Sequence, residues 1–330
     1  MTMMTDEEKK FLLKISRMYY FEDCTQAEIA KKVGVSRPII SKGLQKALHV
    51  KLVEIIIHDQ AAPTIDLEQE IESAFSLEEV IVVPTADMST ELANSALAKA
   101  ASSYVLKQLK HVTKIGISWG TTLHNLVKEF PEEAHEHLKI IPLVGGMGSN
   151  RIELHSNQIA YELSKKLNCS CESLYAPAIV ESESFRDLLL QTPTVADVLE
   201  EAKKIDLAIV GIGNPFMQST LEEIGYIGDE ELKSLEASGV VGDINSCFIC
   251  RDGTIAKNSI NERVIGIQVV ELKSVSKVIA IVQGSHKADS VLAALRGGYI
   301  HTLITDEQTA SEMVRLMKIQ SHKQDSGQPS

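Results

Sequence analysis

The strongest constraint on the fold lies between Val80 and Thr305, where short runs of valine and isoleucine alternate with segments of helical periodicity. A strand in which every residue is apolar must be buried on both faces, and intervening helices supply that cover. The pattern therefore predicts a doubly wound α/β domain with a mostly parallel sheet. The predicted strands are Val80–Val83, Lys114–Ser118, Lys139–Val144, Leu207–Gly211, Val278–Val282 and Leu303–Thr305. The predicted helices are Thr90–Leu109, Thr121–Phe130, Gln158–Leu167, Val195–Lys203, Ala288–Leu295 and Glu307–Met317.

Composition excludes several classes of protein. The 330 residues are 44% hydrophobic and 24% charged, which is typical of a globular chain rather than a disordered one. No segment approaches the ~18 consecutive apolar residues that a membrane-spanning helix needs. The N-terminus is polar and lacks the apolar core of a secretion signal. We therefore expect a cytoplasmic protein that does not contact a membrane.

The net charge of −12 argues against nucleic acid when it is taken as a single number. The distribution of charge along the chain, in contrast, is compatible with nucleic-acid binding by one part of it. Residues 1–60 carry a net charge of +2, and the segment Thr25–Lys51 alone carries +5, whereas residues 61–330 carry −14. A small basic module joined to a large acidic one indicates two different partners.

The basic segment has the pattern of a helix-turn-helix. Thr25-Gln-Ala-Glu28 matches a capping box, and Gly34 ends the short helix that follows it. Ser36 is a candidate cap for a second helix, with Pro38 tolerated in its first turn. Two short helices separated by a glycine are typical of this motif, and Phe11–Phe21 would be the preceding helix. Ile39, Ile40 and Leu44 are assigned to the buried side of the second helix.

In a helix-turn-helix the second helix enters the major groove with its N-terminal residues leading. The predicted DNA-binding residues are Arg37, Ser41, Lys42 and Gln45. Arg37 would pair with guanine or phosphate, and Gln45 would read adenine. The alternative is an ordinary helical hairpin with a solvated lysine face. Gly43 stands where a branched apolar residue is usual, and Val50–His58 is predicted as the strand of a wing.

Glycine-rich loops follow four of the predicted strands. They contain Gly116–Thr122, Pro142–Gly148, Asp206–Gly213 and Gln283–Lys287. Ligands of open parallel sheets bind at the carboxyl ends of strands, where loops lead into helix N-termini. Four such loops, one of them with a lysine, predict an anionic or polyhydroxyl ligand.

Two catalytic or metal-binding interpretations are weaker. Gly116-Ile-Ser118-Trp-Gly120 matches the nucleophile elbow of a hydrolase, with His286 as its histidine, but the domain has no early glycine-rich oxyanion segment. Cys169-Ser-Cys171 and Cys247-Phe-Ile-Cys250 resemble paired zinc ligands, yet the second pair falls in a predicted strand or strand pair. We expect reduced cysteines, no metal, no cofactor and no catalytic residues.

With these segments in place, the chain resembles a SorC-type transcriptional regulator, a family grouped with DeoR-like sugar-responsive regulators. The resemblance covers nearly the whole chain. It rests on Thr25-Gln-Ala-Glu-Ile-Ala, Gly34-Val-Ser-Arg37, Gly116-x-x-x-Gly120-Thr-Thr, Pro142-Leu-Val-Gly-Gly146, Asp206 with Gly211-Ile-Gly213, Val241-Gly-Asp243, Gly284-x-x-Lys287, Leu295-Arg-Gly-Gly-Tyr-Ile300 and Leu303-Ile-Thr-Asp306.

The resemblance implies an effector domain with the fold of sugar-phosphate isomerases and deaminases, without their catalysis. The effector-binding residues that it implies are Gly120, Thr121, Thr122, Gly145, Gly146, Gly213, Asp243, Gly284 and Lys287. The threonines would hold phosphate or hydroxyl groups, Asp243 would accept hydrogen bonds from hydroxyls, and Lys287 would supply positive charge. Val144 stands where some relatives carry lysine or arginine, which removes one candidate phosphate-binding cation.

The expected organisation is a winged helix-turn-helix at 1–60, a linker helix at 61–78, an effector and oligomerisation domain at 79–318 and a disordered tail at 319–330. The expected function is regulation, as a repressor, of a carbohydrate-utilisation operon by a sugar or phosphosugar. The expected partners are operator DNA, this effector and further copies of the chain in a dimer or tetramer. The alternative is an active sugar-phosphate isomerase or deaminase with a DNA-binding head, with Asp206 or Asp243 as its base.

Overall fold

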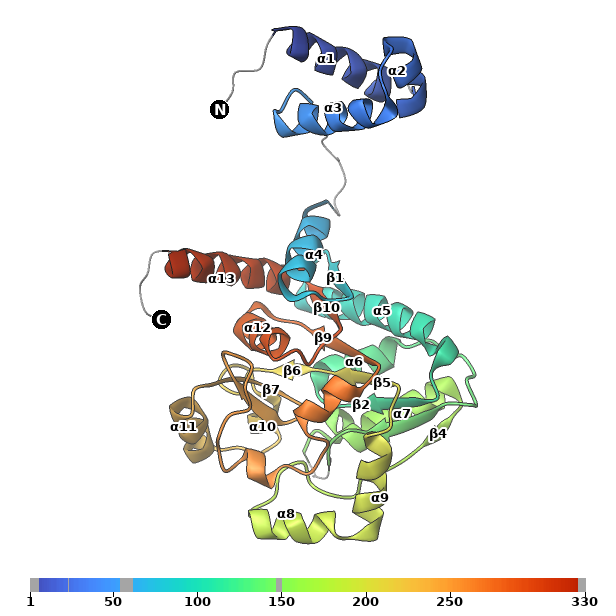
Figure 1. The fold of residues 1–330 in the computed structure, drawn as a ribbon. Helices are drawn as coiled ribbons and strands as arrows, with labels where there is room; N and C mark the ends of the chain where they lie inside the picture. The colour runs from blue at the N-terminus through green and yellow to red at the C-terminus, as the bar shows by residue number, and fades with distance from the viewer. Residues whose placement is uncertain (1–5, 23, 54–61, 147–149, 326–330) are drawn as a thin grey trace. The chain divides into compact units, whose positions relative to one another are not determined.

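The computed structural model describes residues 6–22, 24–53, 62–146 and 150–325, and it divides the chain into two compact units at residues 59 and 60 (Figure 1). The smaller unit contains helices α1 (Asp6–Tyr20), α2 (Gln26–Val33) and α3 (Arg37–His49). Its core is formed by Leu12 and Ile15 of α1, Ile29 of α2, and Ile40 and Leu44 of α3. The three helices and the turn between α2 and α3 are those that the sequence predicts.

Both predicted signals around α2 are present. The Thr25 hydroxyl accepts the Glu28 N–H at 3.3 Å, and the Thr25 N–H donates to Glu28 Oε2 at 2.8 Å. Gly34 ends the helix with φ 79°, a left-handed conformation that glycine adopts without strain. Ser36 precedes α3 as predicted, but its side chain makes no capping hydrogen bond.

Two residues of α3 differ from expectation. Gly43 is buried, and a Cβ at this position would lie 2.6 Å from Cδ1 of Ile15, so α1 fills the space that a larger side chain would occupy. Ile39 is 49% exposed, which corrects its assignment to the buried side. The buried stripe runs through Ile40, Leu44 and Ala47, and at ~100° per residue Ile39 lies to one side of it. Of the predicted strand Val50–His58, residues 50–53 form a turn and residues 54–58 lie outside the described part.

The larger unit is built on a seven-stranded sheet in the order β1-β10-β9-β5-β2-β3-β4, and every pairing in it is parallel. Its strands are β1 (Glu79–Val83), β2 (Lys114–Ile117), β3 (Lys139–Pro142), β4 (Ser170–Cys171), β5 (Leu207–Val210), β9 (Lys277–Val282) and β10 (Thr302–Asp306). All six predicted strands are therefore present, and the two-residue β4 is an addition.

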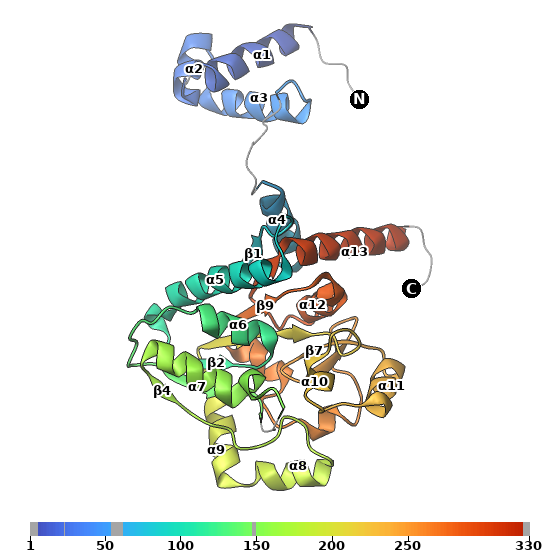
Figure 2. The same cartoon turned by 180° about the vertical axis from the view of Figure 1, so that it is seen from behind.

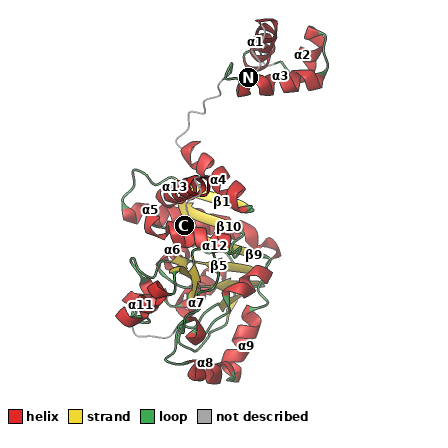
Figure 3. Cartoon of the chain, turned by 60° about the vertical axis from the view of Figure 1, so that its left-hand side comes forward, coloured by secondary structure: helices red, strands yellow, loops and turns green. Residues whose placement is uncertain are grey.

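Helices cover both faces of this sheet (Figures 2 and 3). Along β9, Val278, Ala280 and Val282 pack on one side, whereas Ile279 and Ile281 pack on the other. The second side is covered by α5 (Thr90–Gln108), α6 (Thr121–Glu129) and α7 (Ser156–Leu167). The first is covered by α4 (Ala62–Phe75), α9 (Pro193–Ala202), α12 (Ala288–Arg296) and α13 (Glu307–Asp325). This is the doubly wound arrangement that the continuous apolar strands predict.

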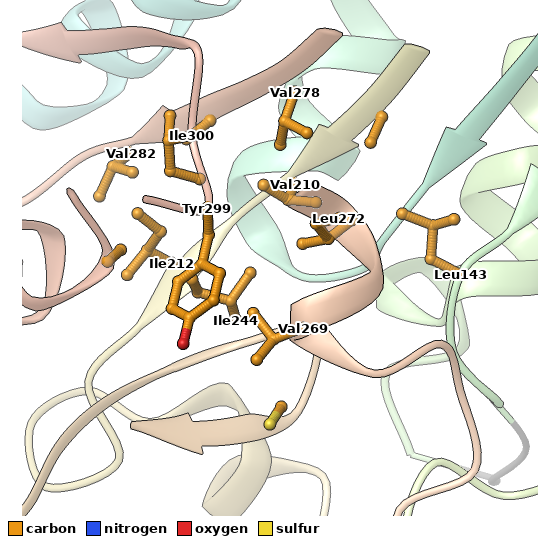
Figure 4. Packing of buried hydrophobic residues seen from close by; sticks show 14 of the residues in the cluster. Leu143, Val210, Ile212, Ile244, Val269, Leu272, Val278, Val282, Tyr299 and Ile300 are labelled. Carbon is orange, nitrogen blue, oxygen red and sulfur yellow. The ribbon is translucent and has the colours of Figure 1, made fainter. Parts of the chain in front are cut away.

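A small antiparallel sheet, β6-β7-β8, lies beside the first and shares its core (Figure 4). It consists of β6 (Ile212–Gly213), β7 (Val240–Ile244) and β8 (Cys247–Cys250), so the cysteine-containing run is a strand pair as expected. The remaining helices are α8 (Glu183–Leu190), α10 (Thr220–Glu223) and α11 (Asp229–Ala237).

The helix expected as a linker, α4, packs on the larger unit. Ile71 is fully buried, and two glutamates one turn apart accept hydrogen bonds from the outer edge of β1. Glu72 Oε1 accepts the Val80 N–H at 2.7 Å, and Glu68 Oε1 accepts the Val82 N–H at 2.8 Å. These carboxylates satisfy an edge strand that would otherwise offer unpaired donors.

The expected disordered tail is wrong over its first residues, because α13 continues to Asp325. Gln320 accepts a hydrogen bond from Arg296 at 2.6 Å, and Lys318 pairs with Glu70 of α4 at 3.1 Å. Residues 326–330 lie outside the described part.

Substitutions of Glu68 test the role of its carboxylate at the edge of β1. Burial is the main cause that raises the pKa of Glu68, and the charges of Glu72 and Glu79 add to it. Because the pKa of Glu68 is raised in the folded protein, ionisation of this carboxyl lowers the free energy of unfolding. This destabilisation is absent below the ordinary pKa of 4.5, and it grows as the pH rises through the pKa that Glu68 has in the folded state. Glu68→Gln keeps an acceptor for Val82 without the charge, so we expect an unchanged or higher melting temperature at pH 7.

Glu68→Ala removes the acceptor as well, and we expect it to cost about 1 kcal/mol in the free energy of unfolding by denaturant. Gln69→Ala, an exposed position on the same helix, is the control for helix propensity. Equal losses for the glutamine and alanine variants of Glu68 would contradict the interpretation.

Candidate functional site

The first candidate site is the exposed side of α3. The side chains of Arg37, Lys42 and Gln45 are exposed there, and Ser41 is half-buried. Within the described residues Arg37 and Lys42 form no ion pair or hydrogen bond, whereas Lys46 on the same helix pairs with Glu8 of α1. The helix therefore presents two uncommitted cations and two hydrogen-bonding side chains on one side, as the sequence predicts.

The second candidate site is a cavity of about 350 Å³ in the larger unit. It lies beyond the carboxyl ends of β1, β10, β9, β5 and β2, the edge at which open parallel sheets bind ligands. Seven of the nine predicted effector-binding residues line it: Gly120, Thr121, Thr122, Gly213, Asp243, Gly284 and Lys287.

One wall of the cavity is the N-terminus of α6. Gly120 precedes the helix with φ 107°, a conformation available to glycine, and Thr121 and Thr122 form the first turn. The first-turn N–H groups of a helix have no acceptor within the helix and lie at the positive end of its dipole. Together with the two hydroxyls, they can bind an anionic group or a cluster of hydroxyls.

Asp243 is held in the lining of the cavity by a tight hairpin turn between β7 and β8. The turn residues Asn245 and Ser246 have φ 55° and 63°, and the Ser246 N–H donates to Asp243 Oδ2 at 3.2 Å. The Asn245 amide donates to the carbonyl oxygens of Leu143 and Ile267, at 3.0 and 3.2 Å, which ties the turn to the segment that follows β3.

Burial raises the pKa of Asp243 to about 6, against the lowering effects of Ser246 and Lys287. Gly213 makes room for this carboxylate, because a Cβ at Gly213 would lie 2.1 Å from Asp243 Oδ1. Asp243 is thus a buried acceptor that is poorly satisfied within the protein.

Lys287 supplies the positive charge of the cavity. It follows β9 in the turn that begins at Gly284, whose N–H donates to Asp306 Oδ2 and Thr309 Oγ1 at 3.1 and 2.9 Å. Burial lowers the pKa of Lys287, and the charges of Asp243 and Asp306 oppose this effect. Among the described residues no carboxylate oxygen lies within 4.0 Å of its ammonium group, and no hydrogen bond to it is formed.

Much of the remaining lining consists of side chains that the sequence analysis did not single out. They carry hydroxyl and amide groups and come from separate loops and helices: Thr85, Asn94, Asn125, Asn214, Gln218 and Gln308. No motif contains them, and only the folding of the strands brings them together. The wall is rich in the donors and acceptors that a polyhydroxyl ligand requires.

Gly145 and Gly146, predicted as the floor of the pocket, do not line the cavity. A Cβ at Gly145 would lie 2.3 Å from the carbonyl oxygen of Pro177, and a Cβ at Gly146 would lie 2.6 Å from Oγ of Ser156. These glycines allow close packing of the backbone. Val144 is fully buried beside them.

The residues of the catalytic alternatives have other partners. Ser118 is 2% exposed, and its hydroxyl donates to Asn245 Oδ1 at 2.9 Å rather than to a histidine. Asp206 lies before β5, at the end of the strand away from the cavity, where it accepts hydrogen bonds from Thr113 and Lys114. Burial alone would raise the pKa of Asp206, but these bonds lower it overall. Asp206 therefore joins β2 and β5 and does not line the cavity.

Metal ligands do not gather in the part of the chain that the structure describes. No group of three or more His, Cys, Asp or Glu side chains is placed there to hold an ion, and the five cysteines form no disulfide. Burial raises the pKa of both Cys169 and Cys171 to about 11, which keeps them as thiols. In the described residues no helix is long and apolar enough to cross a membrane.

Known proteins are similar to this chain over most of its length. A family described as "Putative sugar-binding domain" matches residues 43–315. The solved structure of the full-length sorbitol operon regulator SorC from Klebsiella pneumoniae is similar over 93% of this chain and 99% of that one, with 28% identity and a TM-score of 0.73. A DeoR family transcriptional regulator from Listeria monocytogenes is 45% identical over 76% of this chain and 99% of its own, with a TM-score of 0.72. The deoxyribonucleoside regulator of Bacillus subtilis is 27% identical over 94% of this chain and 99% of its own.

The buried carboxylate in the cavity predicts a pH dependence of stability. A rise from the ordinary 3.8 to about 6 makes ionised Asp243 cost roughly 3 kcal/mol at most. The cost develops as pH rises from about 4 to about 6 and is complete above that range. We therefore expect Asp243→Asn to raise the melting temperature more at pH 7.5 than at pH 5.

Asp252→Asn is the matched control. A side-chain hydrogen bond from Thr254 is the main cause that lowers the pKa of exposed Asp252, so this variant gains nothing as pH rises. If the melting temperatures of Asp243→Asn and wild type differ by the same amount at pH 5 and pH 7.5, the raised pKa assigned to Asp243 is wrong.

Proposed function

The chain belongs to the SorC-type family of sugar-responsive transcriptional regulators, and on that premise we propose that a sugar or phosphosugar bound in the cavity controls how tightly α3 binds operator DNA. The observation that carries this proposal is a set of polar groups in one cavity that the described residues satisfy only in part. The Lys287 ammonium forms no ion pair within 4.0 Å there, Asp243 is buried with a raised pKa and one long hydrogen bond, and the first turn of α6 lines the cavity. A polyhydroxyl ligand with an anionic group supplies a partner to each.

The charges of the lining groups indicate which part of the effector each of them binds. The anionic group binds at Lys287 and the N-terminus of α6, through Gly120, Thr121 and Thr122. Asp243 accepts hydrogen bonds from hydroxyls, and the loop amides supply further donors and acceptors. Lys287 and the α6 N-terminus together favour a phosphorylated effector, even though Val144 supplies no cation.

The response is a two-state equilibrium between DNA-binding and released forms. A ligand shifts it only by its difference in affinity for the two states. We propose a symmetric homo-oligomer, a dimer or tetramer, in the cytoplasm, because paired reading helices match paired operator half-sites. Effector binding would change the spacing of the helices and relieve repression of an operon for carbohydrate use. The relatives are transcriptional regulators, and the isomerase alternative is set aside.

DNA binding is tested through the two uncommitted cations of α3. Arg37→Ala and Lys42→Ala should each weaken binding and reduce the slope of log K against log [salt] by about 1 if the residue contacts phosphate. Fluorescence anisotropy with operator DNA over a range of salt concentrations measures both quantities. Lys128→Ala, an exposed lysine of the larger unit, is the control. Unchanged affinities and slopes for both α3 variants would refute the assignment.

Effector binding is tested through Lys287. A thermal-shift panel of sugars and their phosphates, on the full-length protein, should show a larger stabilisation by a phosphorylated compound. Lys287→Met should weaken that compound roughly 10- to 100-fold by removing a charge-assisted hydrogen bond, while Lys128→Met leaves it unchanged. In the absence of ligand, DNA affinity should stay at the wild-type value. Equal binding of the phosphate by Lys287→Met would exclude this lysine from the site.

A further inference from the structure

Ile39 stands out on the exposed side of α3. It lies in the first turn of the helix, between Arg37 and Ser41, and 49% of its surface is exposed. Single apolar side chains on a protein surface are common and need no special explanation. Ile39 differs from such residues in its position, because the N-terminal turn is the part of a recognition helix that contacts base edges.

The neighbours of Ile39 define the face that it occupies. Lys42 follows three residues later on the same stripe of the helix and has no partner within the described residues. Lys46 continues that stripe but is bound to Glu8 of α1. Ile39 is therefore an apolar group next to an uncommitted cation at the leading end of α3.

The other exposed branched aliphatic residue of α3 is Leu48, which is 37% exposed. It lies nine residues further along the helix, about 13 Å away at 1.5 Å per residue. Leu48 is thus at the trailing end, outside the reach of base edges that the first turn contacts. Ile39 therefore occupies a position from which a recognition helix contacts bases, whereas Leu48 does not.

We propose that Ile39 reads thymine in the operator, through contact between its side chain and the C5 methyl group in the major groove. The inference rests on the proposed DNA-binding function of α3. Thymine is the base that places a methyl group on the major-groove edge, and apolar side chains recognise it there. A lysine that binds phosphate, the role open to Lys42 beside Ile39, carries no sequence information, so Ile39 adds selectivity on this side of the helix.

The experiment uses the full-length protein and a DNA site enriched from a random library by wild-type binding. Each thymine of the enriched site is replaced in turn by deoxyuridine, which lacks only the C5 methyl group. We expect one thymine, or its symmetry mate, at which wild-type affinity falls about 3- to 5-fold, the effect of losing one buried methyl group. Ile39→Ala should bind the unmodified site correspondingly more weakly and show no further loss on replacement at that position.

Leu48→Ala is the matched control, and it should keep the wild-type sensitivity to the methyl group. Binding of Ile39→Ala to unrelated DNA at low salt should match wild type, which shows that the helix remains folded with Arg37 and Lys42 in place. Wild-type binding that tolerates every deoxyuridine, or a methyl effect that persists in Ile39→Ala, would overturn the proposal. Failure of wild type to enrich any sequence would instead overturn the DNA-binding function on which it rests.

Discussion

Burial of the parallel strands on both faces is the constraint on which the larger unit depends. The residues of β5 and all but the first of β9 are enclosed, with isoleucine, valine and alanine packed against helices on either side. The enclosed residues of these two strands carry no polar side chain, so at the centre of the sheet polar chemistry is confined to the ends of the strands. Because the strands are parallel, their carboxyl ends and the helix N-termini that follow converge on one edge. The cavity is the direct consequence of that convergence.

The cavity carries an electrostatic imbalance in the absence of ligand. Burial raises the pKa of Asp243 and lowers that of Lys287, so each charged form is disfavoured by its surroundings. A fixed hairpin turn, held by Asn245, keeps the carboxylate from moving out to solvent. Buried polar groups of this kind are costly when they lack partners, which is the physical basis of the proposal that a molecule with both hydroxyl and anionic groups binds here.

The cations of α3 in the smaller unit differ in whether they form an ion pair. Lys46 is paired with α1, whereas Arg37 and Lys42 are without partners in the described residues. A basic surface on a chain whose remaining residues carry −14 confines attraction for DNA to one small region. Gly43 contributes by allowing Ile15 of α1 to approach α3 closely, which holds the reading helix against the core.

Local sequence determined most elements of this protein, because the signals for them are short-range. Strand runs, the capping box at Thr25 and the glycine at the end of α2 predicted the six long parallel strands and most of the helices to within a few residues, whereas α8, α10, α11 and the full length of α13 were not predicted. The family resemblance supplied the seven lining residues, and six of them lie in the glycine-rich loops, since a parallel sheet brings its strand ends to one edge. Tertiary structure alone decided which glycines line the cavity: Gly145 and Gly146 look like Gly213 in sequence, but neighbouring segments pack against them. It likewise decided that Asp206 joins strands, that Ile39 faces outward, and that amides from separate loops meet in one wall. Whether a residue is buried, and which residues it contacts, depend on segments far apart in the chain, so a local sequence pattern does not predict them.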